Sequence, residues 1–79
     1  MIRVLFFGPV ADRVRSREMQ LDFVVGMTLH DVIAQLGAQH PNAFDIVSFI
    51  AVNQNQVRDK QMALQDNDEI AFMAKFSGG

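Results

Sequence analysis

The segment 28-TLHDVIAQLGAQ-39 is the strongest indication of the fold, because it predicts the clearest amphipathic helix of the chain. Its apolar residues follow the spacing i, i+3, i+4 and i+7 and form one stripe: Leu29, Val32, Ile33 and Leu36. Thr28 precedes the stripe as an N-cap, and Asp31 takes the acidic position of a capping box three residues later. Pro41 prevents the helix from continuing. A single helix of this kind can cover only one face of a small mixed sheet.

Segments rich in β-branched and aromatic residues lie on both sides of this helix and predict strands. They are residues 2–7, 18–24, 48–53 and 69–75. Residues 9–15 predict a short helix, since Pro9 suits a first helical turn. A polar turn over 54–56 leads to a short return near Val57, and Asn67 can adopt the left-handed conformation in the turn before the last strand. The order strand, strand, helix, strand, strand predicts an α+β fold.

Composition limits the classes of function. The 79 residues form one domain, and the absence of cysteine excludes disulfides and thiolate metal sites. A net charge of −2 argues against non-specific nucleic-acid binding. No apolar run approaches the length that a membrane span needs, and MIRVLFFGPV is interpreted as a first strand rather than a signal peptide. We therefore expect a cytoplasmic location.

Few side chains suggest catalysis or metal binding. His30 and His40 are ten residues apart, and lone histidines at this spacing are typical of surface or capping positions. The serines lack a nucleophile-elbow context: Ser16, Ser48 and Ser77. Asp66, Asp68 and Glu69 resemble the start of a calcium loop, but Ile70 occupies the next ligand position, which favours a solvated turn. We expect no metal site.

A small basic run is the most concentrated charge in the sequence: Arg13, Arg15 and Arg17. Such a run is more often a solvated edge than a contact for an acidic partner.

The chain ends on Ser77-Gly78-Gly79, where two residues without side chains follow a predicted strand. From Phe76 to Gly79 the backbone can reach roughly 13 Å. A Gly-Gly end can thread a narrow tunnel and present its carboxyl group to the α-phosphate of ATP. Sulfide attack on the resulting acyl-adenylate would give a thiocarboxylate. Without cysteine this chain cannot carry sulfur as a persulfide, so the Gly79 α-carboxylate is the group available for sulfur chemistry.

Several motifs, in this order, resemble one known family. They are VLFFGPVADR at 4–13, TLHDVIAQL at 28–36, AVNQNQV at 51–57, LQDNDEIAF at 64–72 and FSGG at 76–79. Together they resemble the ubiquitin-like sulfur carriers of the β-grasp fold, most closely the small subunit of molybdopterin synthase (the MoaD family). The resemblance implies one β-grasp domain over 1–79, in ββαββ order, with 76–79 as a flexible tail.

The resemblance also implies a function. An E1-like activating enzyme would adenylate Gly79 with ATP and magnesium, and conversion to a thiocarboxylate would follow. The tail would then enter the large subunit of molybdopterin synthase, within a heterotetramer, and donate sulfur to precursor Z. The chain would bind no cofactor itself and would not be catalytic alone.

The tail contributes little binding energy, so affinity must come from the body of the domain. We expect the uncovered sheet face to carry Leu5, Phe7 and Met73 as a partner-binding apolar patch, with Phe76 anchoring the root of the tail. The alternative is that Phe7 belongs to the core.

Two other functions remain open. A thiamine-pathway sulfur carrier would share the fold and the terminal chemistry, but such carriers are usually shorter and seldom begin with a double Phe. The segments LFF and HPNAFDIVS therefore favour the molybdopterin interpretation. The other alternative is a β-grasp interaction module with an incidental Gly-Gly end. A free-standing enzyme is the least favoured, because no base and nucleophile pair is evident.

Overall fold

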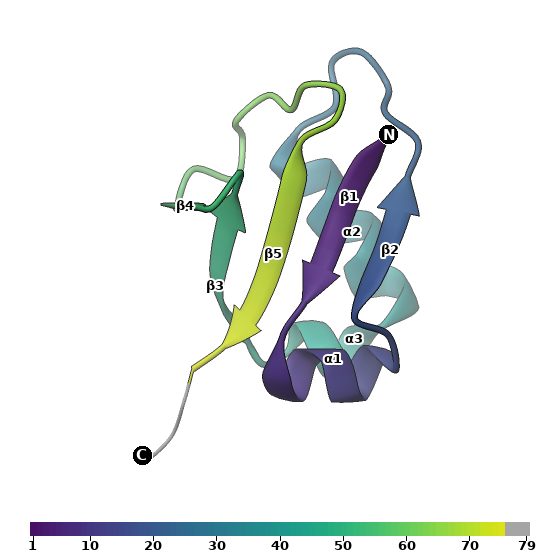
Figure 1. The fold of residues 1–79 in the computed structure, drawn as a ribbon, viewed down its shortest axis with the longest axis vertical. Coiled ribbons are helices and arrows are strands. Elements are labelled where there is room, and N and C mark those ends of the chain that lie inside the picture. The colour runs from purple at the N-terminus through teal and green to yellow at the C-terminus, as the bar shows by residue number, and fades with distance from the viewer. Residues whose placement is uncertain (76–79) are drawn as a thin grey trace.

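The strands that begin and end the domain lie side by side at the centre of one sheet (Figure 1). The protein is described from a computed structural model over residues 1–75. β1 (Ile2–Phe6) pairs in parallel with β5 (Glu69–Ala74), and Val4 lies opposite Ile70. This parallel pair forms because the chain crosses over through the helices between its two ends.

The other strands extend the sheet on both sides of this pair. β2 (Glu18–Leu21) pairs antiparallel with β1. β3 (Val47–Val52) pairs antiparallel with β5, and β4 (Asn55–Val57) pairs antiparallel with β3. The five-stranded order is therefore β2-β1-β5-β3-β4. The predicted α+β fold with a mixed sheet is confirmed.

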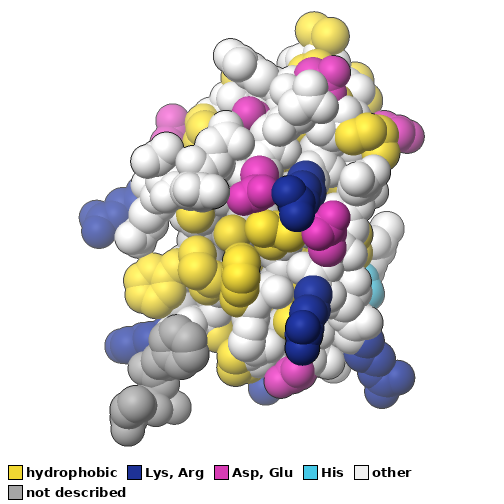
Figure 2. All heavy atoms as spheres, viewed as in Figure 1, with side chains coloured by type: hydrophobic (Ala, Val, Ile, Leu, Met, Phe, Trp, Pro, Cys, Tyr) yellow, Lys and Arg dark blue, Asp and Glu magenta, His cyan; other side chains and the backbone are white. Residues whose placement is uncertain are grey.

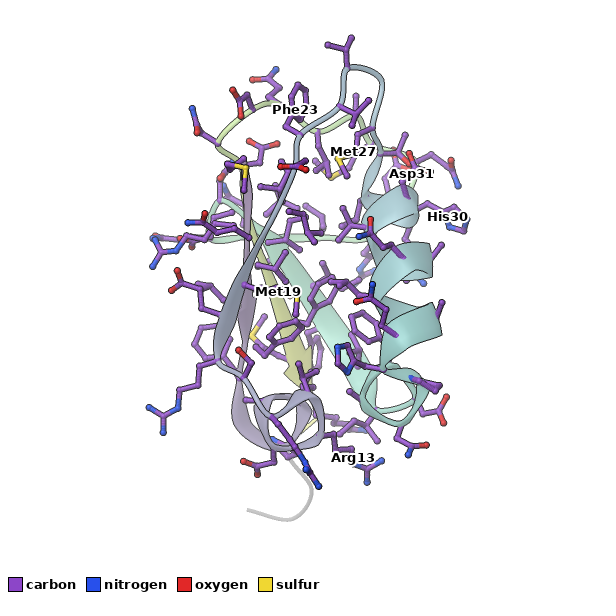
Figure 3. The ribbon with its side chains drawn as sticks, turned by 90° about the vertical axis from the view of Figure 1, so that its right-hand side faces the viewer. Arg13, Met19, Phe23, Met27, His30 and Asp31 are labelled. Atoms are coloured by element: carbon purple, nitrogen blue, oxygen red, sulfur yellow. The ribbon has the colours of Figure 1, made fainter. Side chains whose placement is uncertain are left out.

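Three helices accompany the sheet: α1 (Gly8–Val14), α2 (Leu29–Gln39) and α3 (Pro41–Phe44). α2 runs behind the strands in Figure 1, and Figure 3 shows it on one side of them. One sheet face is thus covered by α2 and the other is left open, as the single long amphipathic helix predicted. Within residues 1–75, none of the helices combines the length and the apolar character needed to cross a bilayer.

The ends of α2 are fixed by the residues that the sequence indicated. The Thr28 hydroxyl accepts a hydrogen bond from the Asp31 amide at 3.3 Å, and the Asp31 carboxylate accepts one from the Thr28 amide at 2.9 Å. This reciprocal pair is the predicted capping box. At the other end, the His40 amide donates to the Leu36 carbonyl, and Pro41 follows.

The core lies between α2 and the inward faces of the two central strands. Its inward residues from β1 and β5 are all buried: Ile2, Val4, Phe6, Ile70, Phe72 and Ala74. From α2, Leu29, Val32 and Leu36 are fully buried, whereas Ile33 lies half-buried at the margin. The Phe72 ring packs edge-on against Phe44, with ring centroids 4.9 Å apart.

Several boundaries differ from the prediction. β2 ends at Leu21 rather than at Val24, and residues 22–27 form a loop in which Phe23 stays half-buried. α3 was not predicted, although Pro41 suits its first turn, where a missing backbone N–H costs no hydrogen bond.

The predicted turn over 54–56 was misplaced. Asn53 and Gln54 both have positive φ, 52° and 71°, so they form the two-residue connection whose twist suits a β-hairpin. Residues 55 and 56 are consequently strand rather than turn, and the predicted return near Val57 is confirmed as part of β4.

The turn before β5 is locked to this hairpin. Asn67 has a φ of 72°, the left-handed conformation that the sequence allowed it. The Asn53 side-chain amide donates to the Asp68 carboxylate at 2.9 Å, and its oxygen accepts from the Glu69 amide at 3.0 Å. The other Asp68 oxygen accepts from the Gln65 amide at 2.7 Å. The Asp68 carboxylate therefore stabilises the turn itself.

Candidate functional site

The open face of the sheet carries an apolar patch across three strands. Side chains alternate along each strand, so residues between the core positions point away from α2. In the register, Leu5 lies opposite Ala71, and Met73 lies opposite Phe49. The term apolar patch is used for five residues of this face: Leu5, Phe7, Phe49, Ala71 and Met73. Hydrophobic side chains gather on this face in Figure 2.

Phe7 is not part of the core. The residue is 48% exposed, and it is the N-cap of α1, directly after β1. Its amide donates to the Phe72 carbonyl at 3.2 Å, which continues the pairing of β1 with β5. Leu5 and Met73, the other two residues predicted for the patch, are half-buried in their strands. The structure therefore brings these three residues to the open face. Their contact with a partner stays a prediction.

Phe49 was missed by the sequence analysis, although it is 40% exposed and opposite Met73. The signal was present: Ile50 and Val52 are core residues, so Phe49 must point to the other face of β3. Ala71 was missed for the same reason.

A charged cluster borders the apolar patch. The Arg3 guanidinium forms ion pairs with Glu18 at 3.2 Å and with Glu69 at 3.3 Å. The hydrogen bond and the charge of Glu18 raise the pKa of Arg3 above its ordinary value. The open face is therefore divided into an ionic half, formed by Arg3 and its two carboxylate partners, and an apolar half.

The predicted tail residues lie outside the described residues: Phe76, Ser77, Gly78 and Gly79. The direction of the strands still indicates where they start. β1 and β5 run parallel, so the C-terminal ends of both strands lie at the same end of the sheet. Phe7 follows one end and Lys75 follows the other. The apolar patch thus lies toward the end of the sheet from which the chain continues to Gly79.

The basic run does not act as one unit. Arg13 donates to the Asn42 carbonyl at 2.9 Å and so joins α1 to α3 (Figure 3). Arg15 ends α1 in the left-handed conformation. Arg17 lines a shallow hollow together with Leu5 and Phe7. Of the three arginines, Arg17 is therefore the one placed beside the apolar patch.

The histidines and acids do not gather into a site among residues 1–75. His30 is exposed in the first turn of α2, beside Asp31 (Figure 3). His40 lies between α2 and α3. No group of three or more metal-ligating side chains occurs in this part of the chain.

Comparison with known proteins gives two sequence matches. Residues 4–79 match the ThiS family. A curated relative in Chlamydomonas reinhardtii, the "Molybdopterin synthase sulfur carrier subunit", is 34% identical over 82 residues. The alignment covers 99% of this chain and 98% of the relative.

Solved structures share the fold. SAMP1 from Haloferax volcanii superimposes with a TM-score of 0.82 at 21% identity, covering 99% of this chain and 98% of that one. A chain in a complex of subunits 1 and 2 of molybdopterin-converting factor from Helicobacter pylori is also similar. It gives a TM-score of 0.76 at 21% identity, with 99% and 97% of the two chains covered. These likenesses confirm the ubiquitin-like β-grasp fold.

Proposed function

The chain belongs to the ThiS family, and we propose that it is the sulfur-carrier subunit of a molybdopterin synthase. The observation that carries the proposal is the 34% identity, over almost the whole of both chains, to the curated subunit of that name. The fold is consistent with this role, because it combines an open apolar face with a strand that leads directly to the terminal glycines.

The reacting group in this proposal is the α-carboxylate of Gly79. A carboxylate is an unreactive acyl donor until one of its oxygens becomes a good leaving group. Attack of the carboxylate on the α-phosphorus of ATP gives an acyl-adenylate and releases pyrophosphate. Hydrosulfide then attacks the carbonyl carbon, AMP leaves with the electron pair of the broken C–O bond, and a thiocarboxylate remains. Gly78 and Ser77 serve as a slender spacer.

The chemistry assigns two kinds of partner. An E1-like adenylating enzyme binds the ATP and magnesium, because this protein contributes only its Gly79 carboxylate, and no side chain, to the activation step. The large subunit of molybdopterin synthase then receives the tail, and we expect a heterotetramer. The Helicobacter pylori complex of subunits 1 and 2 supports pairing with a large subunit.

The apolar patch supplies the affinity for these partners. Phe7 and Phe49 are large, rigid and substantially exposed, which are properties of residues that dominate interfaces. Because the apolar patch lies toward the end of the sheet from which the chain continues to Gly79, a protein docked there has the tail within reach. Phe76, at the root of the tail, would anchor its start.

Mass spectrometry tests this proposal. The intact protein, incubated with the E1-like enzyme, ATP, magnesium and sulfide, should gain the mass of one sulfur in place of one oxygen on the peptide that ends at Gly79. Variants that lack Gly79, or that carry one residue after it, should fold normally and stay unmodified. Failure to form either the acyl-adenylate or the thiocarboxylate would favour an interaction module with an incidental Gly-Gly end.

A further inference from the structure

The first half of β3, residues 47–49, has a free edge. β3 runs from Val47 to Val52, but β4 pairs only with residues 50–52. Residues 47–49 therefore have no strand on that side among residues 1–75, as Figure 1 shows for the part of β3 below β4. The pairing with β5 is also irregular here, since its register shifts between Val47 and Phe49 and leaves Ser48 without an opposite residue. Backbone groups at such an edge are available to an added strand.

An apolar groove of about 420 Å³ runs along this edge. Its floor comes from residues on four elements: Ile33 and Gly37 of α2, Phe44 of α3, Val47 and Ile50 of β3, and Phe72 of β5. Gly37 lies close to Phe44, so that a Cβ added at this position would make an ordinary van der Waals contact with the Phe44 side chain. The groove is distinct from the apolar patch on the open face, and Phe49 borders both.

Two cations stand at the rim of this groove. Arg58 and Lys60 line it and are exposed, and no aspartate or glutamate is among the residues that line it. Neither cation forms an ion pair within residues 1–75. The position of this rim is fixed, since the Lys60 carbonyl accepts from the His30 amide at 2.7 Å and the Met62 carbonyl accepts from the Leu29 amide at 3.1 Å.

We propose that this groove binds an extended, acidic peptide segment of a partner protein, which pairs with the free edge of β3. Strand addition of this kind takes its affinity from main-chain hydrogen bonds and its specificity from pockets for alternate side chains. Here every second side chain of the segment enters the groove over Phe44 and Ile33. A carboxylate of the segment, next to its own apolar residues, pairs with Arg58 or Lys60.

The polar groups of the groove favour a peptide over a small ligand. Small-molecule sites are concave, mostly apolar pockets in which a few precisely placed polar groups fix the orientation of the ligand. This groove instead lies along an unpaired strand edge, whose backbone groups match those of an extended peptide, and its polar side chains are Ser48, Gln56, Arg58 and Lys60. A second copy of this chain that pairs through the same edge is a poorer occupant, because it brings its own Arg58 and Lys60, and no carboxylate, among the residues that line the groove.

Titration with a defined peptide tests the proposal. The probe is the synthetic segment Asp-Asp-Val-Thr-Val-Thr-Asp-Asp, capped at both ends, and the readout is the amide NMR spectrum of the whole protein. We expect shifts confined to residues 47–50 and 56–60. The double variant Arg58→Glu with Lys60→Glu should weaken binding at least about fivefold. The control Arg15→Glu, at an exposed arginine that is the C-cap of α1, should leave the affinity unchanged.

Two control peptides separate pairing from charge attraction. A peptide with proline in place of one threonine loses a backbone donor and should bind more weakly, while a lysine-flanked peptide should not bind. The proposal is overturned if the aspartate-flanked peptide fails to shift the amide signals of these residues, or if the shifted signals belong to the open face. It is equally overturned if the aspartate-flanked and lysine-flanked peptides bind with the same affinity. It is also overturned if the free protein already covers the groove by self-association. Because no readout involves Gly79, failure here would leave the sulfur-carrier proposal standing.

Discussion

Replacement of Phe7 by aspartate separates docking from folding. A buried phenylalanine covers about 150–250 Å², so the 48% exposed fraction of Phe7 leaves roughly 100 Å² for a partner to cover. At about 25 cal/mol per Å², this area contributes about 2.5 kcal/mol to binding. Its loss corresponds to roughly a 60-fold weaker affinity for the large subunit.

The same substitution has a compensating effect on stability. Phe7 is the N-cap of α1, with extended backbone angles, and no side chain caps this helix. An aspartate at this position can accept from the first free amides, which stabilises a helix by about 1 kcal/mol. The buried half of Phe7 costs about 2.5 kcal/mol when removed. The net loss of about 1.5 kcal/mol is small beside the roughly 4–12 kcal/mol expected for a domain of 79 residues.

Two measurements on matched variants check this reasoning. Isothermal titration against the large subunit should show weak binding for Phe7→Asp and for Phe7→Ala. Urea unfolding should show Phe7→Asp to be about 1 kcal/mol more stable than Phe7→Ala, because only aspartate caps α1. Val25→Asp is the control, since Val25 is 89% exposed in the loop at the opposite end of the molecule (Figure 1) and should change neither property. An unfolded Phe7→Asp protein, or a folded one with unchanged affinity, would refute the docking role of Phe7.

Three further predictions concern the elements that hold the fold. Thr28→Ala removes the hydroxyl that accepts from Asp31 and should lower the free energy of unfolding by about 1 kcal/mol in urea, whereas Thr28→Ser should lower it by less. Asn67→Val should cost about 1–2 kcal/mol because valine disfavours a φ of 72°, while Asn67→Gly should be nearly neutral in the same assay. The N-terminal ammonium, chiefly through its hydrogen bond, lowers the pKa of Asp66 below its ordinary value. The ionised form is therefore stabilised by folding, so the stability advantage of the wild-type protein over Asp66→Asn should be present at neutral pH and decline as the pH falls below about 4 in pH-dependent thermal unfolding. An advantage that stays constant down to pH of about 2 would contradict this assignment.

Much of the fold follows from local sequence signals. The capping box of Thr28 and Asp31, with the apolar stripe behind it, predicts α2 and its start. Alternation in residues 2–7 separates Val4, which is buried, from Phe7, which is exposed. These predictions succeed because one local pattern and one covered sheet face are sufficient to determine them.

The errors arise where tertiary contacts decide the local structure. The polar letters of QNQ predict a turn over 54–56, yet Asn53 also bonds to Asp68 and Glu69 across the molecule, which fixes the hairpin turn one residue earlier. β2 stops at Leu21 because its pairing with β1 reaches only as far as Ile2. Such long-range constraints leave no mark within the segment that they shape.

The candidate site could be predicted only in part. Leu5, Phe7 and Met73 come from alternation in strands whose inward faces are clear, and Phe49 follows once the core side of β3 is known. The groove beside β3 could not be predicted, because it depends on how short β4 is and on where Arg58 and Lys60 come to lie.

Transfer of sulfur from Gly79 to precursor Z can be followed directly. The thiocarboxylated protein is mixed with the large subunit of molybdopterin synthase and precursor Z, and the mass of the carrier is followed beside the formation of the dithiolene. We predict that the carrier returns to the carboxylate form as molybdopterin appears, with two carriers discharged for each product because a dithiolene holds two sulfur atoms. A carrier that keeps its sulfur with this large subunit, yet discharges to a thiazole synthase, would contradict the account and assign the protein to the thiamine pathway.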